Sequence, residues 1–169
     1  MPDVAVRRAG PEDIPAVIAL HERCWRISYA GLADADAKFA RGVAEWERLW
    51  AGILDSTRVV ELHGAVAGFV VFGPSRDADA AEGSGEIQAL YVDPDAQGAG
   101  LGAALVTRAR DELAAGGYER VTLWTFEHNP ASRGFYERLG FVWDGTATRD
   151  DDGPIVRYVH TLHPTGAAR

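Results

Sequence analysis

The spacing of apolar and polar residues divides the first third of the chain into one strand and two helices. Alternation at Val4–Ala9 predicts a short strand. Apolar residues at helical spacing from Ile14 to Trp25 predict a helix. Its first turn contains proline and acidic residues, which the start of a helix favours. A break at Tyr29–Leu32 separates it from a second helix, which we expect from Ala35 to Leu54.

The middle of the chain has the pattern of a hairpin, a further strand and a helix. Two apolar segments flank His63-Gly64, a pair that suits a tight turn, and they predict a β-hairpin. The polar stretch Pro74–Gly85 predicts a loop, and Glu86–Val92 predicts the next strand. Leucine and alanine at spacing four predict a helix that begins after a glycine-rich stretch and ends at Gly116-Gly117.

The last third adds a strand, a short helix and a closing pair of strands. A strand is expected at Arg120–Phe126, followed by a helix with Asn129 as N-cap and Pro130 in the first helical position. Phe141–Thr148 and Ile155–Leu162 predict an antiparallel pair. The resulting order, β-α-α-β-β-β-α-β-α-β-β, predicts a mixed and mostly antiparallel sheet with helices on both faces.

Composition fits one ordinary globular domain over residues 1–169, with a frayed end at 164–169. No apolar stretch approaches a membrane span, and no signal-peptide pattern opens the chain. The single Cys24 cannot form an internal disulfide, which favours a reducing cytoplasm, and we interpret it as a small buried hydrophobe. The net charge of −8 argues against a nucleic-acid partner.

The stretch from Gln97 to Gly102 contains three glycines at the junction of a strand and a helix. The first N–H groups of a helix lack internal partners, and the helix dipole is positive there. Glycine lets an anion approach the backbone closely and permits positive φ. The pattern favours a phosphate or pyrophosphate site, and a tight turn with glycines for packing is the alternative.

Two nucleotide-binding motifs are similar in sequence to this stretch. A P-loop would need a lysine that is missing here. A dinucleotide fingerprint matches formally at Gly98-x-Gly100-x-x-Ala103. However, Asp93–Gln97 separates the strand from the first glycine, and the acidic candidate Glu127 comes later than the fingerprint requires. A nicotinamide-dependent oxidoreductase therefore stays a minor alternative.

The stretch "ALYVDPDAQGAGLGAALV" resembles the acyl-CoA-binding motif of the GNAT superfamily, the GCN5-related N-acetyltransferases. Residues 97–102 match the pattern Gln/Arg-x-x-Gly-x-Gly/Ala, after Val-x-Pro at 92–94. A second motif of the family is similar to "YERLGF" at Tyr136–Phe141, seven residues after Asn129. The resemblance covers nearly the whole chain and implies the GNAT fold, with a twisted sheet and a central pair of parallel strands that splay apart.

In this family acetyl-CoA binds between the two splayed strands, here Glu86–Val92 and Val121–Phe126. The resemblance implies that helix-start amides hold the pyrophosphate and that strand backbone pairs with pantetheine. Asn129 corresponds to a pantetheine or water ligand, although a plain helix cap is the alternative. The implied acetyl-CoA contacts are Leu90, Tyr91, Val92, Gln97, Gly98, Ala99, Gly100, Leu101, Gly102, Ala103 and Asn129.

The resemblance also implies two catalytic residues. Tyr136 matches the acid that protonates the CoA thiolate, and its alternative role is a half-buried aromatic. Glu86 matches a base that acts through water, and its alternative role is a solvated residue at a strand start. Relatives differ in the source of this base. A backbone N–H at Leu90–Val92 would bind the oxyanion.

The acceptor side is specified less clearly. The resemblance places acceptor contacts at Trp25 and Tyr29, within a Trp-x-x-x-Tyr-x-Gly-Leu element of some bacterial relatives, and near Phe39, Trp46 and the loop Pro74–Gly85. Aromatics at helical spacing also suit a core. A small-molecule or peptide amine is expected as acceptor, and the resemblance leaves a homodimer open.

We therefore predict a cytoplasmic N-acetyltransferase that acts directly in a ternary complex, without nucleic acid, membrane or metal. His160 and His163 are three apart on a strand or its end, which does not suit a metal site. A non-catalytic acyl-CoA-binding regulatory domain is the alternative of a different class. It would keep the glycine stretch but lack a working base and acid.

Overall fold

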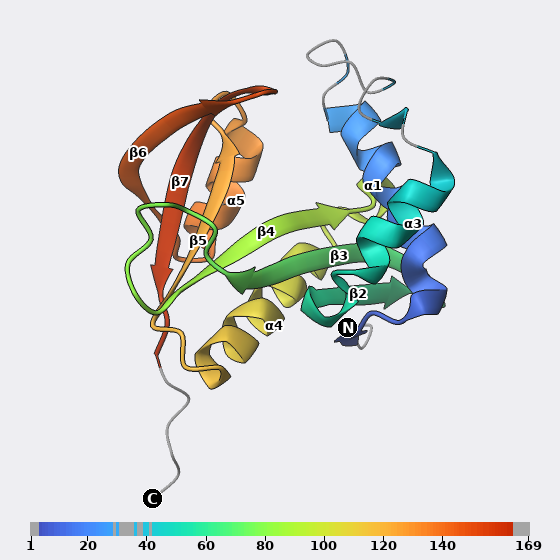
Figure 1. Ribbon diagram of the computed structural model, residues 1–169, viewed down its shortest axis with the longest axis horizontal. Helices are drawn as coiled ribbons and strands as arrows, with labels where there is room; N and C mark the ends of the chain where they lie inside the picture. Colours follow the sequence, from blue (N-terminus) through green and yellow to red (C-terminus); the bar gives the residue numbers. More distant parts are fainter. Residues whose placement is uncertain (1–3, 29, 31–35, 37–38, 41, 164–169) are drawn as a thin grey trace, which may run out of the picture. The chain divides into compact units, whose positions relative to one another are not determined.

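The helices and strands follow one another in the order that the hydrophobic pattern predicts. The computed structural model describes residues 4–28, 30, 36, 39–40 and 42–163. Among them no helix is both long and apolar enough to cross a membrane. The elements labelled in Figure 1, together with β1, are β1 (Val6–Arg8), α1 (Ile14–Ser28), α3 (Val43–Ala51), β2 (Thr57–Leu62), β3 (Ala65–Pro74), β4 (Ser84–Val92), α4 (Leu101–Ala115), β5 (Arg120–Phe126), α5 (Pro130–Arg138), β6 (Val142–Asp150) and β7 (Gly153–Thr161).

The strands of the described residues form a mixed sheet in the order β1-β2-β3-β4-β5-β7-β6. The pairs β1–β2, β2–β3, β5–β7 and β6–β7 are antiparallel, whereas β4 and β5 are parallel. Parallel neighbours need a crossover connection, and α4 supplies it here. The predicted fold class is therefore confirmed: a mostly antiparallel sheet with one central parallel pair.

The chain divides into two compact units. The first comprises Met1–Val71 and Ala89–Arg108, and the second comprises Phe72–Gln88 and Ala109–Arg169. Strands β3 and β4 and helix α4 each contribute residues to both units.

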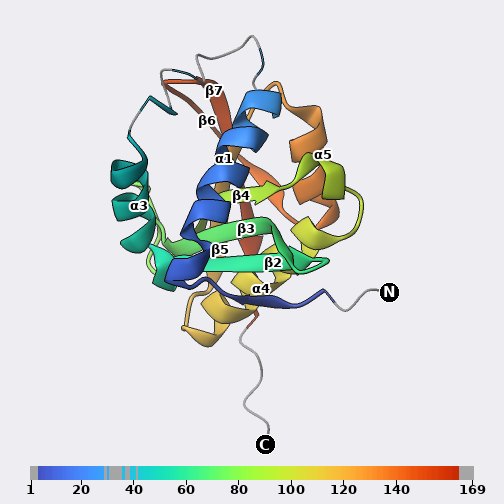
Figure 2. The same ribbon diagram turned by 90° about the vertical axis from the view of Figure 1, so that its right-hand side faces the viewer.

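The core of the first unit lies between α1, α3 and one face of β2 and β3. Figure 2 shows α1 crossing β2 and β3. Val59 and Phe69 are paired in register, so their side chains lie on the same face, toward α1. The core residues of this face are Ala9, Ile14, Val17, Leu20, Cys24, Trp50, Val59, Phe69 and Val71.

The opposite face of β2 and β3 meets the first turns of α4. Val60 and Gly68 form the next register pair, so they point away from α1. A Cβ atom at Gly68 would lie 3.0 Å from Val60 Cγ1 and 3.1 Å from Leu105 Cδ1. The absence of a side chain at Gly68 therefore lets α4 approach the sheet closely, and helices cover both faces as predicted.

The second unit is built on β5, β7 and β6. Strand β7 pairs with β5 from Arg120–Thr161 to Phe126–Ile155, and the β6–β7 hairpin is visible at one edge in Figure 1. The fully buried Tyr158 of β7 joins this sheet to α5. Its hydroxyl accepts from Arg133 Nε at 2.9 Å and donates to Glu137 at 2.7 Å.

The predicted turns and helix ends are confirmed. His63 and Gly64 both have positive φ, 52° and 80°, as a tight hairpin turn requires. Helix α4 ends at Ala115; beyond it Gly117 has φ 87°, and Tyr118 N donates to Leu113 O. Asn129 Oδ1 accepts from Ser132 N at 3.0 Å and caps α5.

The expected helix from Ala35 to Leu54 is not continuous: among its described residues, Asp36, Phe39 and Val43–Ala51 are helical, whereas Ala40 and Gly42 are not. Helix α3 begins at Val43, because Gly42 is extended with φ −61° and ψ 153°, and it ends at Ala51. A separate 3-10 turn follows at Leu54–Ser56. Ala35 and the expected break at Tyr29–Leu32 lie outside the described residues, except Ala30.

Other boundaries differ by a few residues. Strand β1 is shorter than expected, and the first helix opens with a 3-10 turn at Pro11–Asp13. The side chain of Asp13 accepts from Gly10 N at 2.8 Å and binds the Arg7 guanidinium. Strand β4 begins two residues before Glu86, at Ser84, whose carbonyl accepts from Ser75 N at 2.9 Å.

The close approach at Gly68 predicts a stability effect. Gly68→Ala should lower the free energy of unfolding by about 1–3 kcal/mol, because the new methyl group also meets the rigid Tyr91 carbonyl at 3.1 Å. Gly52→Ala is the control: its φ of −72° suits alanine, so a change of about 0.5 kcal/mol or a slight gain is expected. Urea unfolding measures the free energy of unfolding of both variants. Equal losses in Gly68→Ala and Gly52→Ala would contradict the close packing at Gly68.

Candidate functional site

The glycine-rich loop before α4 has the backbone conformation that its sequence predicts. Gly98 and Gly100 have φ of 83° and 79°, a region that L side chains rarely adopt. A Cβ atom added at either glycine would meet nothing within 4 Å. Packing against protein therefore does not explain these two glycines, and the space in front of them is open.

The first turn of α4 presents unbonded backbone donors. The first donor that bonds to the backbone is Ala104 N, which donates to Gly100 O at 3.0 Å. No described residue accepts a hydrogen bond from the N–H groups of Gly100 to Ala103. These donors lie at the positive end of the helix dipole, an arrangement suited to a bound anion such as a phosphate.

Arg23 of α1 fixes the connection between β4 and this loop, a role that the sequence did not indicate. Its Nη1 donates to both carboxylate oxygens of Asp93 at 2.7 Å, and its Nη2 donates to Asp95 at 2.7 Å. Asp93 also caps a 3-10 turn at Pro94–Ala96 by accepting from Asp95 N at 2.9 Å. The connection is thus held in place from α1 while the glycines that follow it stay open.

Cys24 lies beside the end of β4 but is unsuited to nucleophilic chemistry. It is buried, and its Sγ donates to Val92 O at 3.4 Å. Burial raises the pKa of the Cys24 thiol to about 11. The thiol is therefore neutral at physiological pH, as expected for a buried hydrophobe.

The parallel pairing of β4 with β5 covers only the first part of each strand. It runs from Ser84–Arg120 to Ile87–Leu123, although β5 continues to Phe126 and β4 to Val92. In the second unit, Gln88 and Trp124 therefore follow the last register pair without forming another. Early termination of this ladder is the local feature expected of strands that splay apart.

Glu86 is buried and ion-paired, so the solvated alternative does not apply. Its side chain is 3% exposed. Oε1 accepts from Arg76 Nη2 at 2.7 Å, and Oε2 accepts from Arg76 Nε at 3.2 Å and from Arg76 backbone N at 2.9 Å. The hydrogen bond to Glu86 is the main cause that raises the pKa of Arg76. Spacing along the sequence did not reveal Arg76 as its partner.

Tyr136 lies in α5 as a buried aromatic residue. Its ring contacts Phe135 and Phe141, with centroids 5.2 Å and 5.8 Å away. Only 8% of the residue is exposed. Asn129, at the start of the same helix, uses Oδ1 for the cap, so the cap role is confirmed and its amide nitrogen is the atom left for a ligand role.

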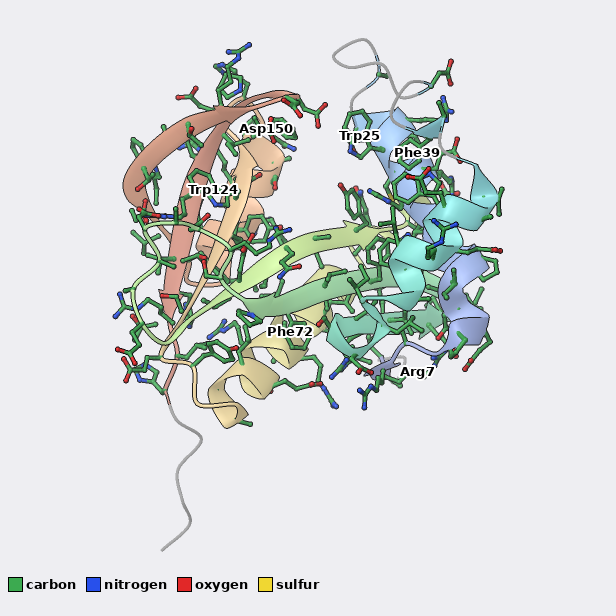
Figure 3. The ribbon with its side chains drawn as sticks, in the orientation of Figure 1. Arg7, Trp25, Phe39, Phe72, Trp124 and Asp150 are labelled. Carbon is green, nitrogen blue, oxygen red and sulfur yellow. The ribbon has the colours of Figure 1, made fainter. Side chains whose placement is uncertain are left out.

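The two residues expected at the acceptor side have different outcomes. Trp25 is 3% exposed, and its ring lies 6.3 Å from that of Phe39 (Figure 3). Tyr29 lies outside the described residues. Sequence reasoning missed His21 as the centre of an aromatic cluster. The rings around His21 within 4.9–6.1 Å are Phe39, Trp46, Trp50, Phe69 and Tyr91.

Arg157 of β7 binds the loop before β4. Its guanidinium donates to Asp77 at 3.2 Å, to Asp79 at 2.7 Å and to Asp144 of β6 at 2.7 Å. Asp77 also accepts from Trp124 Nε1 at 2.9 Å. The polar loop expected from its sequence is therefore held to the sheet of the second unit by charge.

No group of three or more metal-ligating side chains is found among the described residues. The first unit presents a helix start with unbonded N–H groups, and the second unit contains the buried carboxylate of Glu86 and the buried phenol of Tyr136. The model of the acetyltransferase (GNAT) family matches residues 14–141. The chain belongs to the GNAT acetyltransferase family.

Known proteins extend this assignment beyond the matched residues. The chain is 32% identical over 131 residues to the uncharacterized N-acetyltransferase YuaI of Bacillus subtilis strain 168, covering 76% of this chain and 75% of YuaI. An N-acetyltransferase structure from Staphylococcus aureus Mu50 has a TM-score of 0.77 at 23% identity. The alignment covers 95% of this chain and 99% of the Staphylococcus aureus chain. The chain is thus an N-acetyltransferase with the GNAT fold.

A further solved structure contains the cofactor. The yncA protein of Salmonella typhimurium, solved with its cofactor acetyl-CoA, has a TM-score of 0.69 at 22% identity. The alignment covers 99% of this GNAT chain and 98% of yncA.

The contacts of Arg157 predict a pH-dependent stability. Hydrogen bonding from Arg157 is the main cause that lowers the pKa of Asp79. A carboxyl with a lowered pKa stabilises the fold above its unfolded pKa, about 3.9, and this stabilisation is lost as the pH falls through the folded pKa. Arg157→Leu should therefore lower the free energy of unfolding at neutral pH, and the difference from wild type should shrink below about pH 4.

Urea unfolding over a pH series tests this expectation. Arg8→Leu is the control, because Arg8 and its partner Asp55 are both exposed and such pairs contribute about 0–1 kcal/mol. A difference between Arg157→Leu and wild type that stays constant from neutral to acidic pH would show that packing, and not charge, explains the effect.

Proposed function

We propose that this GNAT enzyme transfers the acetyl group of acetyl-CoA to a primary amine by direct attack in a ternary complex. The unbonded N–H groups at the start of α4, behind two open glycines, are the main support for this proposal. They are the donors that the pyrophosphate of coenzyme A would need. The acetyl-CoA bound to the yncA protein supports acetyl-CoA as the proposed ligand.

Acetyl-CoA is proposed to contact the backbone from the end of β4 to the start of α4, together with the side chain of Asn129. The pyrophosphate would accept from amides between Gly98 and Ala103, with Gln97 beside it. The pantetheine amides would pair with the backbone of Leu90, Tyr91 and Val92, as an added strand does. The amide nitrogen of Asn129 is a further proposed donor.

The chemistry moves two protons off the acceptor nitrogen. We propose that the ammonium group loses its first proton to Glu86, directly or through a water. The nitrogen then forms the N–C bond, and the oxyanion accepts from a backbone N–H at Leu90–Val92. As the C–S bond breaks, Tyr136 donates its phenol proton to the sulfur, and the second proton of the nitrogen restores the phenol.

A direct route fits the state of the cysteine. An acyl-enzyme would need a thiolate, yet burial raises the pKa of Cys24 to about 11. The Cys24 thiol also already donates its hydrogen bond to the carbonyl of Val92. The acetyl group is therefore proposed to pass from sulfur to nitrogen in one site without a covalent protein intermediate.

The acceptor remains defined by class. Trp25 and Tyr29 are proposed to lie at the acceptor side, and His21, the centre of the aromatic cluster, belongs to the same helix as Trp25. A small-molecule amine or a peptide N-terminus is the proposed substrate.

The direct test is acetyl-CoA turnover with a panel of amines. Thiol release would be followed with polyamines, aminoglycosides, amino acids, arylamines and short peptides, beside a control without amine. Turnover with at least one class supports the proposal. Coenzyme A binding without turnover of any class would instead indicate an acyl-CoA-binding protein.

Gly100→Ala should weaken coenzyme A binding. The new methyl group enters the open space in front of the helix-start amides, so the dissociation constant should rise about tenfold or more, which equals roughly 1.4 kcal/mol. Gly117→Ala is the matched control: its φ of 87° is similar and its Cβ space is also open, but it lies at the other end of α4.

Both variants should lose similar stability from the strained φ. Calorimetry with coenzyme A separates them, because affinity should fall only in Gly100→Ala. Equal affinity in the two variants would remove the glycine loop from the proposed site.

Tyr136→Phe should lower kcat about tenfold or more and alter the alkaline limb of the pH–rate profile, because the sulfur loses its proton donor. The affinity for acetyl-CoA should change little. Tyr118→Phe, a tyrosine beyond the end of α4, is the control and should keep wild-type rates. A kcat within twofold of wild type would reject Tyr136 as the general acid.

A further inference from the structure

The counter-ion of Glu86 is unusual in its exposure. The Glu86 side chain is 3% exposed, whereas the Arg76 side chain is 63% exposed. No other described residue donates a hydrogen bond to the Glu86 carboxylate. A buried carboxylate is costly unless it is paired, so this carboxylate depends on one cation that is itself in contact with solvent.

The backbone of Arg76 is fixed independently of its guanidinium. Arg76 N donates to Glu86 Oε2 at 2.9 Å, and the preceding Ser75 N donates to Ser84 O at 2.9 Å. The next residue, Asp77, is held by Trp124 and Arg157. The guanidinium can therefore leave Glu86 by rotation of its side chain alone, without movement of the loop.

The pairing conflicts with the proposed task of Glu86. Both oxygens of the Glu86 carboxylate accept hydrogen bonds from Arg76, so the guanidinium stands where the ammonium group of an acceptor would have to bind. Glu86 can take a proton from the acceptor only if Arg76 withdraws. Withdrawal without replacement would leave the buried charge unpaired, so a second cation must arrive as the first leaves.

We propose that Arg76 occupies, in the free enzyme, the position at Glu86 that the ammonium group of the acceptor takes during catalysis. This inference rests on the proposed function and narrows it: the acceptor binds as a cation and must exchange with the guanidinium. Neutral amines of low basicity, such as arylamines, lack the charge that drives the exchange. Arg76 is thus a positioning and specificity-determining residue.

The first test is a comparison of kinetic constants for the best acceptor of the amine panel. Arg76→Ala should lower the KM for the amine about threefold to tenfold, because a site that is rarely open gains apparent affinity when its competitor is removed. The KM for acetyl-CoA should stay unchanged. Arg8→Ala is the matched control, since the Arg8 side chain is 62% exposed and also ion-paired.

Unchanged or raised KM for the amine in a folded Arg76→Ala protein would overturn the inference. Arg76→Gln provides a second variant in case the alanine variant is too unstable, and the same outcomes apply. An arylamine that turns over as well as an alkylamine of similar size would also count against it.

The second test needs no acceptor. Methylguanidinium should raise the melting temperature of Arg76→Ala relative to sodium chloride at equal ionic strength, because it restores the missing counter-ion in the native state only. The wild type and the double variant Arg76→Ala/Glu86→Gln should show no such rise. Equal responses of all three proteins would overturn the inference.

The two tests keep the inference separate from the proposed function. Protection of Arg76→Ala by methylguanidinium without turnover of any amine would retain the cation site and reject the acetyl transfer. Turnover with unchanged amine KM and no protection would retain the acetyl transfer and reject the exchange.

Discussion

The open backbone donors at the start of α4 are the constraint on which the proposed function depends. A helix start that is not capped must give its N–H groups to water or to a ligand. Here the approach is kept free of side chains by Gly98 and Gly100, both in a region of φ that disfavours other residues. The connection before them is held instead by Arg23, which binds Asp93 and Asp95. Rigid support and an open surface are thus provided by different residues.

Local signals in the sequence were sufficient for most of the fold. The hairpin turn at His63-Gly64, the end of α4 just before Gly117 and the cap of α5 at Asn129 each depend on residues close together in the chain. The helix expected from Ala35 failed at Gly42, whose extended backbone interrupts an otherwise helical pattern. Glycine tolerates both conformations, so its own sequence context does not decide between them.

The site was predictable where it depends on backbone and unpredictable where it depends on distant side chains. Motif spacing located the glycine loop, and the resemblance drew attention to Glu86 and Tyr136. The partner of Glu86 lies ten residues earlier in a polar loop, and Arg23 meets Asp93 across 70 residues. Such pairs follow from the register of strands and the path of loops, which no local pattern encodes.

The second unit contains two arginines whose ion pairs differ in how exposed the cation is. The Arg157 side chain is 12% exposed and forms ion pairs with Asp77, Asp79 and Asp144. Arg76, the residue before Asp77, keeps its guanidinium in contact with solvent. Arg157 of β7 and Arg76 of the loop therefore have different freedoms. Loss of Arg157 would leave partly buried acids unpaired, while Arg76 can be replaced by any small cation that reaches Glu86. A fixed loop with one exchangeable cation is a physical means of selecting a charged acceptor while keeping the buried carboxylate paired throughout.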